Sequence, residues 1–544
     1  MKNLTHEDEK FLVEKIVDMF EKFDNARQKQ IKMIDNIKNA IYNEGLPTSQ
    51  KSWQSRVELP DVYELAQTLK SHICENVFSN PESMFDVSGQ NIEAQKFANS
   101  QKAMLVNVLE NMKFSNSLDK VVDDLVETGE ATIFVGWKND FKKIRRAQTF
   151  EEQLFSPTDD GYVVEKKLIY DAPYIQPINP KNFVFDVSRK ENWNSCPKIY
   201  RTYLDPHIIK NDVANNCLNA DKSSDLINMT VDKNEIANKN VYEKQVEILE
   251  FWGDIALENG EILEDILITI AGRKHLIRAE NNPFVINPFV YTNLIEDPFT
   301  QRGISPLSVS LIFNSLASEI LNKQLDALSL IMNPPYLAPK GAFKGAQNIT
   351  PGEIIEYDPS LMPVQPVALK FDSALIGWDF IKYFKSQTES ATGIFKNMAG
   401  AIQPTARTAT ELNYTVSGQA ARLNFIIEKL YKNLIMPTIE RIADLLSAFK
   451  FGSESICVKS KGEFVFMEIN DAIRCADYLY HFGDRRANAE RKAKSKELFD
   501  IITALAKMPT MAENVDWIEC FKFALEQYGI ENPENFLKTT VNIE

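Results

Sequence analysis

Residues 302–335 read RGISPLSVSLIFNSLASEILNKQLDALSLIMNPP, and the prediction of the fold starts from this segment. Ser305 is a favourable N-cap residue, and Pro306 suits the first position of a helix. Leucine and isoleucine then recur every three or four residues until Asn333-Pro334-Pro335 ends the pattern. The stretch therefore predicts a single helix about 40 Å long.

Two further helical patterns follow this stretch. The second helix is predicted over residues 375–398, before glycine and proline interrupt the pattern. The third begins with the capping box Thr408-Ala409-Thr410-Glu411 and continues to Leu446. Pro437 lies inside this third pattern, so we expect a kink there.

The insert between the first two helices is rich in proline. Residues 334–372 contain seven prolines, which exclude a long helix. The short runs Glu353–Tyr357 and Val367–Phe371 are typical of strands, and proline confines such strands to the edges or ends of a sheet. We therefore expect a small β-containing insert.

The remainder of the chain alternates helical and strand-like patterns, which predicts an α+β fold. Gly129 and the pair Asn259-Gly260 are expected to end a helix and to form a hairpin turn, respectively. Residues 206–240 are polar and resemble a surface excursion. Helices are predicted at 5–42, 62–80, 92–112, 118–128 and 485–507, and strands at 131–137, 162–170, 246–252, 262–270, 288–291, 455–459 and 464–469.

Composition limits the classes of function. The formal net charge of −15 argues against a broad nucleic-acid-binding surface, although an acidic channel could still let DNA pass. The six cysteines include no CxxC pair, so reduced thiols are expected. Residues 1–10 lack a signal-peptide core and no run of 18 apolar residues occurs, so we expect a cytoplasmic protein without membrane contact.

No motif in the sequence carries catalytic chemistry. An ATPase of the P-loop type would need a Gly-Lys-Ser/Thr loop to hold phosphates, and the sequence has none. The five histidines are far apart, and neighbouring acids such as Asp123-Asp124 are typical of a solvated helix face. We therefore predict no catalytic residue, no metal site and no cofactor.

The order of these elements resembles the core of bacteriophage portal proteins, in particular the podovirus-type head-to-tail connector family. The resemblance covers most of the chain and depends on the order and spacing of short strings. These strings are RGISP at 302–306, NKQLD at 322–326, NPP at 333–335, TGI at 392–394, ATE at 409–411, SGQAARL at 417–423 and IMP at 435–437.

The resemblance implies a portal-like α+β fold with named regions. These regions are a mixed helical and β wing, a two-helix stem, a small clip, a long kinked helix and a short helical crown. Their expected bounds are 1–301 for the wing, 302–333 and 375–398 for the stem helices, 334–374 for the clip, 399–407 for the tunnel loop, 408–450 for the kinked helix, 451–483 for the return to the wing and 484–544 for the crown.

Several residues become candidate contact sites under this resemblance. Lys385, Lys396 and Arg407 are predicted to face DNA in the tunnel, where one cation per subunit becomes a ring of charge. The alternative is that they are solvated or paired with carboxylates. Weaker candidates are Arg485, Arg486 and Arg491 for DNA contact in the crown, and Tyr336, Ile354, Ile355 and Tyr357 for subunit or adaptor contact in the clip.

The implied function is a ring-shaped DNA conduit at one capsid vertex of a virion. The resemblance implies that copies of the chain assemble as a dodecamer. The other implied partners are double-stranded DNA, major capsid and scaffolding proteins, the terminase large subunit and tail adaptors. Small residues such as Ala317 and Ser318 on the long helix favour packing against copies of the chain. A nucleic-acid-acting enzyme with a dispersed site and a capsid or scaffolding protein without a channel remain alternatives.

Overall fold

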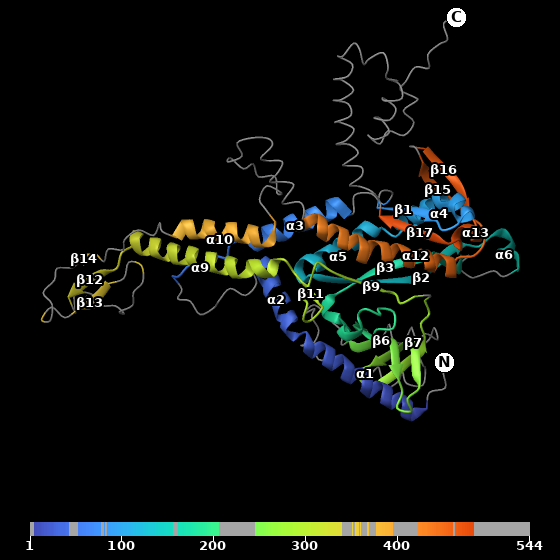
Figure 1. The fold of residues 1–544 in the computed structure, drawn as a ribbon, viewed down its shortest axis with the longest axis horizontal. Helices are drawn as coiled ribbons and strands as arrows, with labels where there is room; N and C mark the ends of the chain where they lie inside the picture. Colours follow the sequence, from blue (N-terminus) through green and yellow to red (C-terminus); the bar gives the residue numbers. More distant parts are fainter. Residues whose placement is uncertain are drawn as a thin grey trace, which may run out of the picture. The chain divides into compact units, whose positions relative to one another are not determined.

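The computed structural model describes residues 5–42, 53–77, 84–155, 162–205, 245–284, 286–339, 377–394, 422–460 and 463–482, with 81, 351, 354–357, 360 and 367–368. These residues form a mixed α+β structure, as predicted (Figure 1). The chain divides into two compact units. Residues 1–79 and 111–450 form the first, and residues 80–110 and 451–544 form the second.

The N-terminal helical pattern is two helices rather than the one predicted. Helix α1 spans His6–Ala26 and begins with a capping box made by Thr5 and Asp8; α2 spans Gln28–Tyr42. The break falls at Arg27, whose buried guanidinium donates to the carbonyl oxygens of Pro180 and Phe183. Arg27 is the C-cap of α1, with φ −100° and ψ 4°, and its side chain satisfies backbone carbonyl groups of a distant part of the chain.

The other predicted helices of the first unit are confirmed. Helix α3 spans Asp61–Val77, and α5 spans Phe114–Thr128. Gly129 ends α5 in the left-handed conformation with φ 84°, as its position predicted.

A five-stranded antiparallel sheet forms the main core of the first unit. Its strand order is β4-β5-β6-β7-β8. Apolar side chains of α1 pack against this sheet, among them Leu12, Ile16 and Phe20. The strands are β4 Phe183–Phe185, β5 Lys198–Leu204, β6 Val246–Ala256, β7 Ile262–Ala271 and β8 His275–Asn281.

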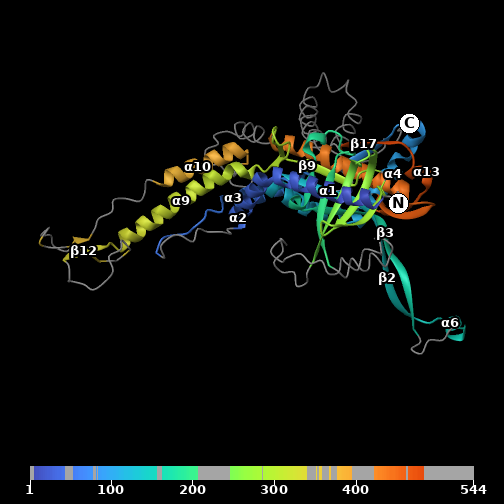
Figure 2. The same cartoon turned by 90° about the horizontal axis from the view of Figure 1, so that it is seen from below.

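A second sheet contains a long two-stranded ribbon. Its order is β3-β2-β9, with β2 Glu130–Ala147, β3 Tyr162–Ile178 and β9 Phe289–Asn293. Helix α6, Phe150–Phe155, follows β2, and the ribbon extends away from the sheet (Figure 2). The prediction ended β2 at Trp137, because the charged residues beyond it lack the apolar alternation of a half-buried strand.

Helices α9 and α10 form the central helix pair. Helix α9 spans Leu307–Met332 and α10 spans Gly377–Thr392, and the two lie side by side (Figures 1 and 2). Helix α10 ends six residues before the predicted Met398. Gly393 has φ +74° and its amide donates to the carbonyl oxygen of Glu389, which ends the helix in the usual glycine manner.

The third helical pattern is interrupted at the predicted place. Residues 422–430 are helical, a π-helical turn spans Tyr431–Ile435 and α12 spans Met436–Phe449. The turn ends two residues before Pro437, which has no amide hydrogen to continue the α-helical ladder. The predicted capping box at 408–411 lies outside the described residues.

The second unit combines sequence-distant strands. The predicted strand pair is confirmed as β15 Glu454–Ser460 and β16 Glu463–Ile469. Strand β1, Phe85–Gly89, pairs with β17, Tyr478–Phe482, which was not predicted. This unit also holds α4, Ile92–Asn111, and α13, Asp471–Arg474, so α4 does not share a compact unit with the other N-terminal helices.

Two other predicted segments, the polar excursion at 206–240 and the helix at 485–507, lie outside the described residues. Within the part of the chain that is described, no helix is both long and apolar enough to cross a membrane.

Candidate functional site

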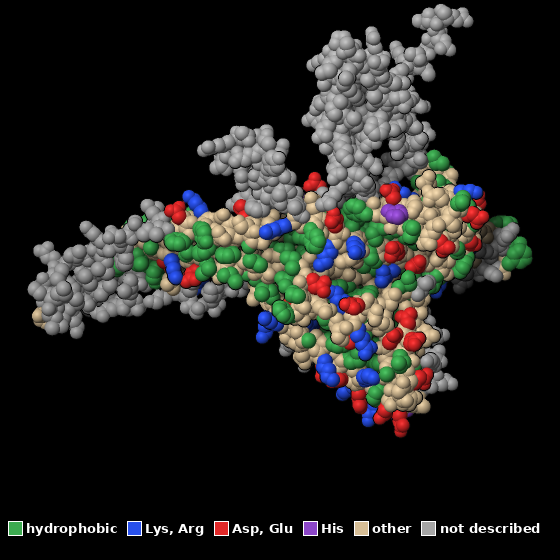
Figure 3. Space-filling model, viewed as in Figure 1, with side chains coloured by type: hydrophobic (Ala, Val, Ile, Leu, Met, Phe, Trp, Pro, Cys, Tyr) green, Lys and Arg blue, Asp and Glu red, His purple; other side chains and the backbone are tan. Residues whose placement is uncertain are grey.

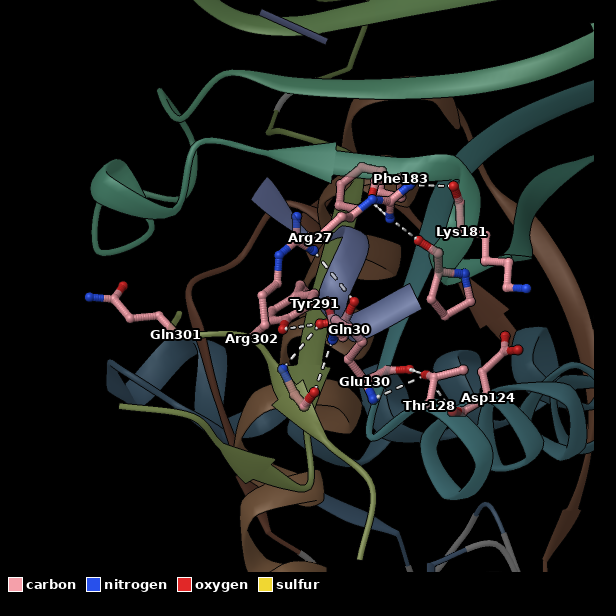
Figure 4. A network of polar contacts seen from close by, with 12 residues as sticks. Arg27, Gln30, Asp124, Thr128, Glu130, Lys181, Phe183, Tyr291, Gln301 and Arg302 are labelled. Atoms are coloured by element: carbon pink, nitrogen blue, oxygen red, sulfur yellow. Dashed lines mark hydrogen bonds and ion pairs between the residues drawn. The ribbon is translucent and has the colours of Figure 1, made fainter. Parts of the chain in front are cut away.

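The start of α9 is held by a buried polar network, which we call the α9 anchor (Figure 4). The Glu130 carboxylate accepts hydrogen bonds from the Gly303 amide at 3.1 Å and the Tyr291 hydroxyl at 2.8 Å. The Arg302 guanidinium lies 3.4 Å from the same carboxylate. Both charged side chains are buried, with exposed fractions of 3% and 6%. The network joins β2, β9 and β11, Gly303–Ile304, at the entrance to α9.

Aromatic rings complete the environment of the anchor. The Arg302 guanidinium carbon lies 3.9 Å from the centroid of the Phe185 ring, a favourable cation–π contact. Burial raises the pKa of Tyr291 well above its ordinary value, and the negative charge of Glu130 raises it further. Tyr291 therefore stays a hydrogen-bond donor to Glu130 across the physiological pH range.

The residues after the anchor connect α9 to the end of α5. Ser305 accepts a hydrogen bond from the Leu307 amide at 3.1 Å and donates to the Val126 carbonyl oxygen at 2.6 Å. The N-cap position of α9 is Pro306, one residue later than predicted. A Cβ at Gly129 would lie 2.2 Å from the backbone of Ile304. The close approach of these two backbones requires glycine at 129, and it fixes α9 relative to α5.

An extended segment runs along α9 and occupies its small polar residues. The amides of Ser55, Val57 and Leu59 donate to Asp326, Asn322 and Ser318 at 2.6, 2.8 and 3.0 Å. The donors are two residues apart in an extended segment, which corresponds to about 6.6 Å. The acceptors are four residues apart in a helix, which corresponds to about 6 Å, so donors and acceptors stay in step.

This contact corrects the prediction about the small residues of α9. Ala317 and Ser318 are buried within the chain, so they do not form a free face for packing against copies. The polar residues Ser318, Asn322 and Asp326 recur every four residues on α9, but this spacing alone does not identify the segment that they bind.

A groove lies on one side of α9, between it and α2; we call it the α2–α9 groove. It has a volume of about 930 Å³ and includes apolar side chains of α9. Ile312 and Leu316 on its α9 wall are 66% and 40% exposed. Its lining also includes Met33, Asn36, Arg56 and Glu319. Figure 3 shows hydrophobic side chains gathered along the α9–α10 pair.

Helix α10 contacts a different face of α9 and carries exposed aromatic residues. Phe384 faces Phe313 of α9 with ring centroids 6.1 Å apart, and Ile381 is buried. Phe380 and Tyr383, which we call the aromatic ridge, are 53% and 56% exposed. Their spacing of three residues puts both on one side of α10. The helix pair thus exposes a groove and a ridge from two different elements.

The predicted tunnel residues are only partly within the described structure. Lys385 forms an ion pair with Asp61 of α3 at 2.7 Å, and its side chain is 29% exposed. Its contact with DNA stays a prediction. Lys396, Arg407, Arg485, Arg486 and Arg491 lie outside the described residues.

The predicted clip strands form a small sheet. Strand β12, Tyr336–Pro339, pairs in parallel with β13, Ile354–Tyr357, and antiparallel with β14, Val367–Ala368. The register places Tyr336 opposite Ile354, Leu337 opposite Ile355 and Pro339 opposite Tyr357. The order β13-β12-β14 leaves β13 and β14 as edge strands of this sheet.

Asp124, beside the anchor, predicts a pH dependence of stability. Burial raises the pKa of its carboxyl to about 7, and the neighbouring charges of Glu127 and Asp123 add to the shift. Between its ordinary pKa and about pH 7, the Asp124 carboxyl is protonated in the folded chain and ionised in the unfolded chain. The contribution of the protonated carboxyl to the free energy of unfolding is therefore complete near pH 3 and is lost as the pH rises to 7.

The Asp124→Asn variant should remove this dependence. At pH 8 we expect it to be more stable than the wild type by on the order of 2 kcal/mol, with little difference near pH 4. Urea unfolding at both pH values measures the difference. Asp123→Asn is the control, because Asp123 forms an ion pair with Lys70 and its loss should not stabilise the chain. If the free energy of unfolding of Asp124→Asn differed from that of the wild type by the same amount at pH 4 and pH 8, the raised pKa of Asp124 would be contradicted.

The comparisons with known proteins agree with these features. A family model described as phage SU10 portal protein matches residues 148–541, which is well over half of the chain. Among curated proteins, none matches the sequence. This match shows that the chain belongs to the phage portal protein family and is a head-to-tail connector, a structural component of the virion.

Proposed function

We propose that copies of this chain form a closed ring that encloses a DNA channel at one capsid vertex. The ring would nucleate head assembly with scaffolding and major capsid proteins, bind the terminase large subunit during packaging, and later receive tail adaptors. The chain itself would not be an enzyme; the terminase would supply ATP hydrolysis. In this proposal α9 and α10 are the stem, residues 334–374 the clip, 399–407 the tunnel loop, and residues from 484 onward the crown.

The observation that carries the proposal is the difference between the two sides of the helix pair. The α2–α9 groove and the aromatic ridge are unlike surfaces on different elements. A contact between unlike surfaces is heterologous, so every subunit can bind one neighbour through its groove and another through its ridge. Such contacts generate a ring when the rotation between subunits closes. A symmetric dimer would instead use one surface twice.

The edge strands support the proposed clip. Among the described residues, β13 and β14 each have only β12 as a neighbour, so one side of each could pair with a strand from another chain. Pairing of Ile354–Tyr357 with an adjacent subunit or with a tail adaptor would add a strand to the sheet. In the same proposal Tyr336, Ile354, Ile355 and Tyr357 supply the clip contacts.

The DNA contacts of the channel would be electrostatic and independent of sequence. Lys396 and Arg407 would reach phosphates in the tunnel, and Arg485, Arg486 and Arg491 would do so in the crown. The Lys385–Asp61 pair gives Lys385 a carboxylate partner within its own chain, so it would contribute less positive potential than an unpaired lysine.

The experiment that tests the proposal is light scattering of the full-length protein after size exclusion, with negative-stain images of the same fractions. We expect a closed ring of about twelve subunits with a central hole. A monomer with metal-dependent nuclease activity, or open polymers of variable length, would contradict the proposed channel.

A further inference from the structure

The shaft of the β2–β3 ribbon, residues 138–147 and 162–171, concentrates positive charge on a chain that is otherwise acidic. These two ranges contain seven lysines and arginines and three carboxylates, a net charge of +4, whereas the whole chain carries −15. In sequence, residues 148–161 between the two strands contain Glu151, Glu152, Asp159 and Asp160 and no lysine or arginine, so the net charge of that segment is negative. The positive charge therefore belongs to the shaft alone.

The register places like charges directly opposite each other. Lys142 pairs with Lys167 and Lys143 pairs with Lys166 across the two strands. Like charges in opposite positions destabilise a two-stranded ribbon, so these two pairs are unfavourable in the isolated chain. All four lysines are exposed. An anion bound beside them would relieve the repulsion.

The carboxylates of the shaft do not neutralise these four lysines. Asp140 forms an ion pair with Lys138 at 2.7 Å, and Glu165 forms one with Arg146 at 2.8 Å. Asp171 accepts a hydrogen bond from the indole of Trp137. Lys166 lies 4.7 Å from the centroid of the Phe141 ring, which orders the ammonium without cancelling its charge. The described residues thus leave the charge of the two lysine pairs uncompensated.

Adjacent pairs of a ribbon point to opposite faces. The pair Lys142/Lys167 is therefore on one face and the pair Lys143/Lys166 is on the other. A flat acidic protein surface could neutralise only one of these faces. The major groove of B-DNA is about 12 Å wide, admits a two-stranded β-ribbon and has phosphates along both walls. A duplex groove is the partner that can neutralise both pairs together.

We propose that the ribbon shaft binds duplex DNA through the phosphates of one groove, using Lys142, Lys143, Lys166 and Lys167. This surface is separate from the proposed channel and does not require a closed ring. The contact is independent of sequence, because lysine–phosphate pairs position a protein without reading bases. It would fix DNA that lies outside the tunnel against the connector.

The test is binding of a fluorescent 30-base-pair duplex of mixed sequence to the full-length protein, measured by anisotropy at several NaCl concentrations. In the variant with Gln at all four lysines, we expect affinity at 0.1 M NaCl to fall at least about 100-fold, and the slope of log K against log salt to fall by about 3 to 4. The variant with Arg at the same positions should bind like the wild type. This second variant keeps the charge and controls for folding.

A matched control removes the same charge elsewhere. Lys10, Lys22, Lys32 and Lys38 are exposed on α1 and α2, and changing all four to Gln should leave duplex binding within about threefold of the wild type. Unchanged binding by the shaft variant, or no binding by the wild type at 20 mM NaCl, would overturn the proposal. Retained binding with loss of ring formation would assign the shaft to a protein contact instead. If the wild-type protein formed no ring but bound duplex DNA through the shaft, only the proposed channel would be contradicted.

Discussion

Replacement of Glu130 by alanine should lower the free energy of unfolding of the first unit by about 3–5 kcal/mol. The carboxylate is buried and accepts hydrogen bonds from Tyr291 and Gly303 while it faces Arg302. Without it, the buried guanidinium of Arg302 has no opposite charge in the anchor, and the Tyr291 hydroxyl loses its acceptor. Breaking one side of a buried pair costs much more than the pair contributes, because the remaining charge stays desolvated.

Urea unfolding followed by tryptophan fluorescence measures this loss. Asp18→Ala is the matched control: Asp18 pairs with Lys22 at 2.6 Å on the surface of α1, and exposed pairs of this kind contribute less than about 1 kcal/mol. The double variant Glu130→Leu, Arg302→Met removes both buried charges and should recover a large part of the loss. If Glu130→Ala were no more destabilising than Asp18→Ala, the network would not be what holds the start of α9.

The anchor also explains why part of this region could be predicted and part could not. Gly129 has the local signal of a helix stop, and the structure confirms it. Ser305 has the signal of a helix cap; its side chain accepts from the Leu307 amide, but the N-cap position is Pro306. Glu130 has none, because its partner Arg302 lies 172 positions away in sequence. Residue type alone cannot show that such a carboxylate is buried, since the burial comes from the packing of β2 against β9 and β11.

The same distinction applies to the other differences between prediction and structure. The pairing of β1 with β17 joins segments almost four hundred residues apart, and a strand of five residues does not show in sequence which distant segment it pairs with. Helix α10 ends at Gly393, a local signal that was present in the sequence and was not used. The segment along α9 depends on matched spacings in two elements, so neither element predicts it by itself.

The candidate assembly surfaces could be predicted from the sequence only in part. The lengths of α9 and α10 could be predicted approximately from periodicity, and so could the presence of apolar stripes. Which apolar residues remain exposed depends on where α2, α3 and the extended segment pack. Ala317 and Ser318 are buried within the chain, so the proposed self-association surfaces are instead Ile312 and Leu316 in the groove and the aromatic ridge.

Charged substitutions on either surface should abolish ring assembly. Ile312→Asp in the groove and Phe380→Asp in the ridge each place a carboxylate in an apolar contact, which costs about 3 kcal/mol at every interface and weakens each contact roughly 100-fold. Both residues are at least half exposed in the single chain, so the variants should fold. Phe299→Asp is the control, because Phe299 is 93% exposed and lies outside both surfaces. Light scattering should give monomers for the two variants and rings for the control.

Mixing the two variants separates a ring-forming contact from a symmetric one. The groove variant keeps an intact ridge, and the ridge variant keeps an intact groove, so one wild-type interface can form between them. The complex cannot grow further, because its two free ends carry the altered surfaces. An equimolar mixture should therefore give a species of two subunits, although each variant alone is monomeric. If the groove and the ridge belonged to independent symmetric contacts, each variant alone would still form dimers through its unaltered surface, and that result would exclude the heterologous arrangement on which a closed ring depends.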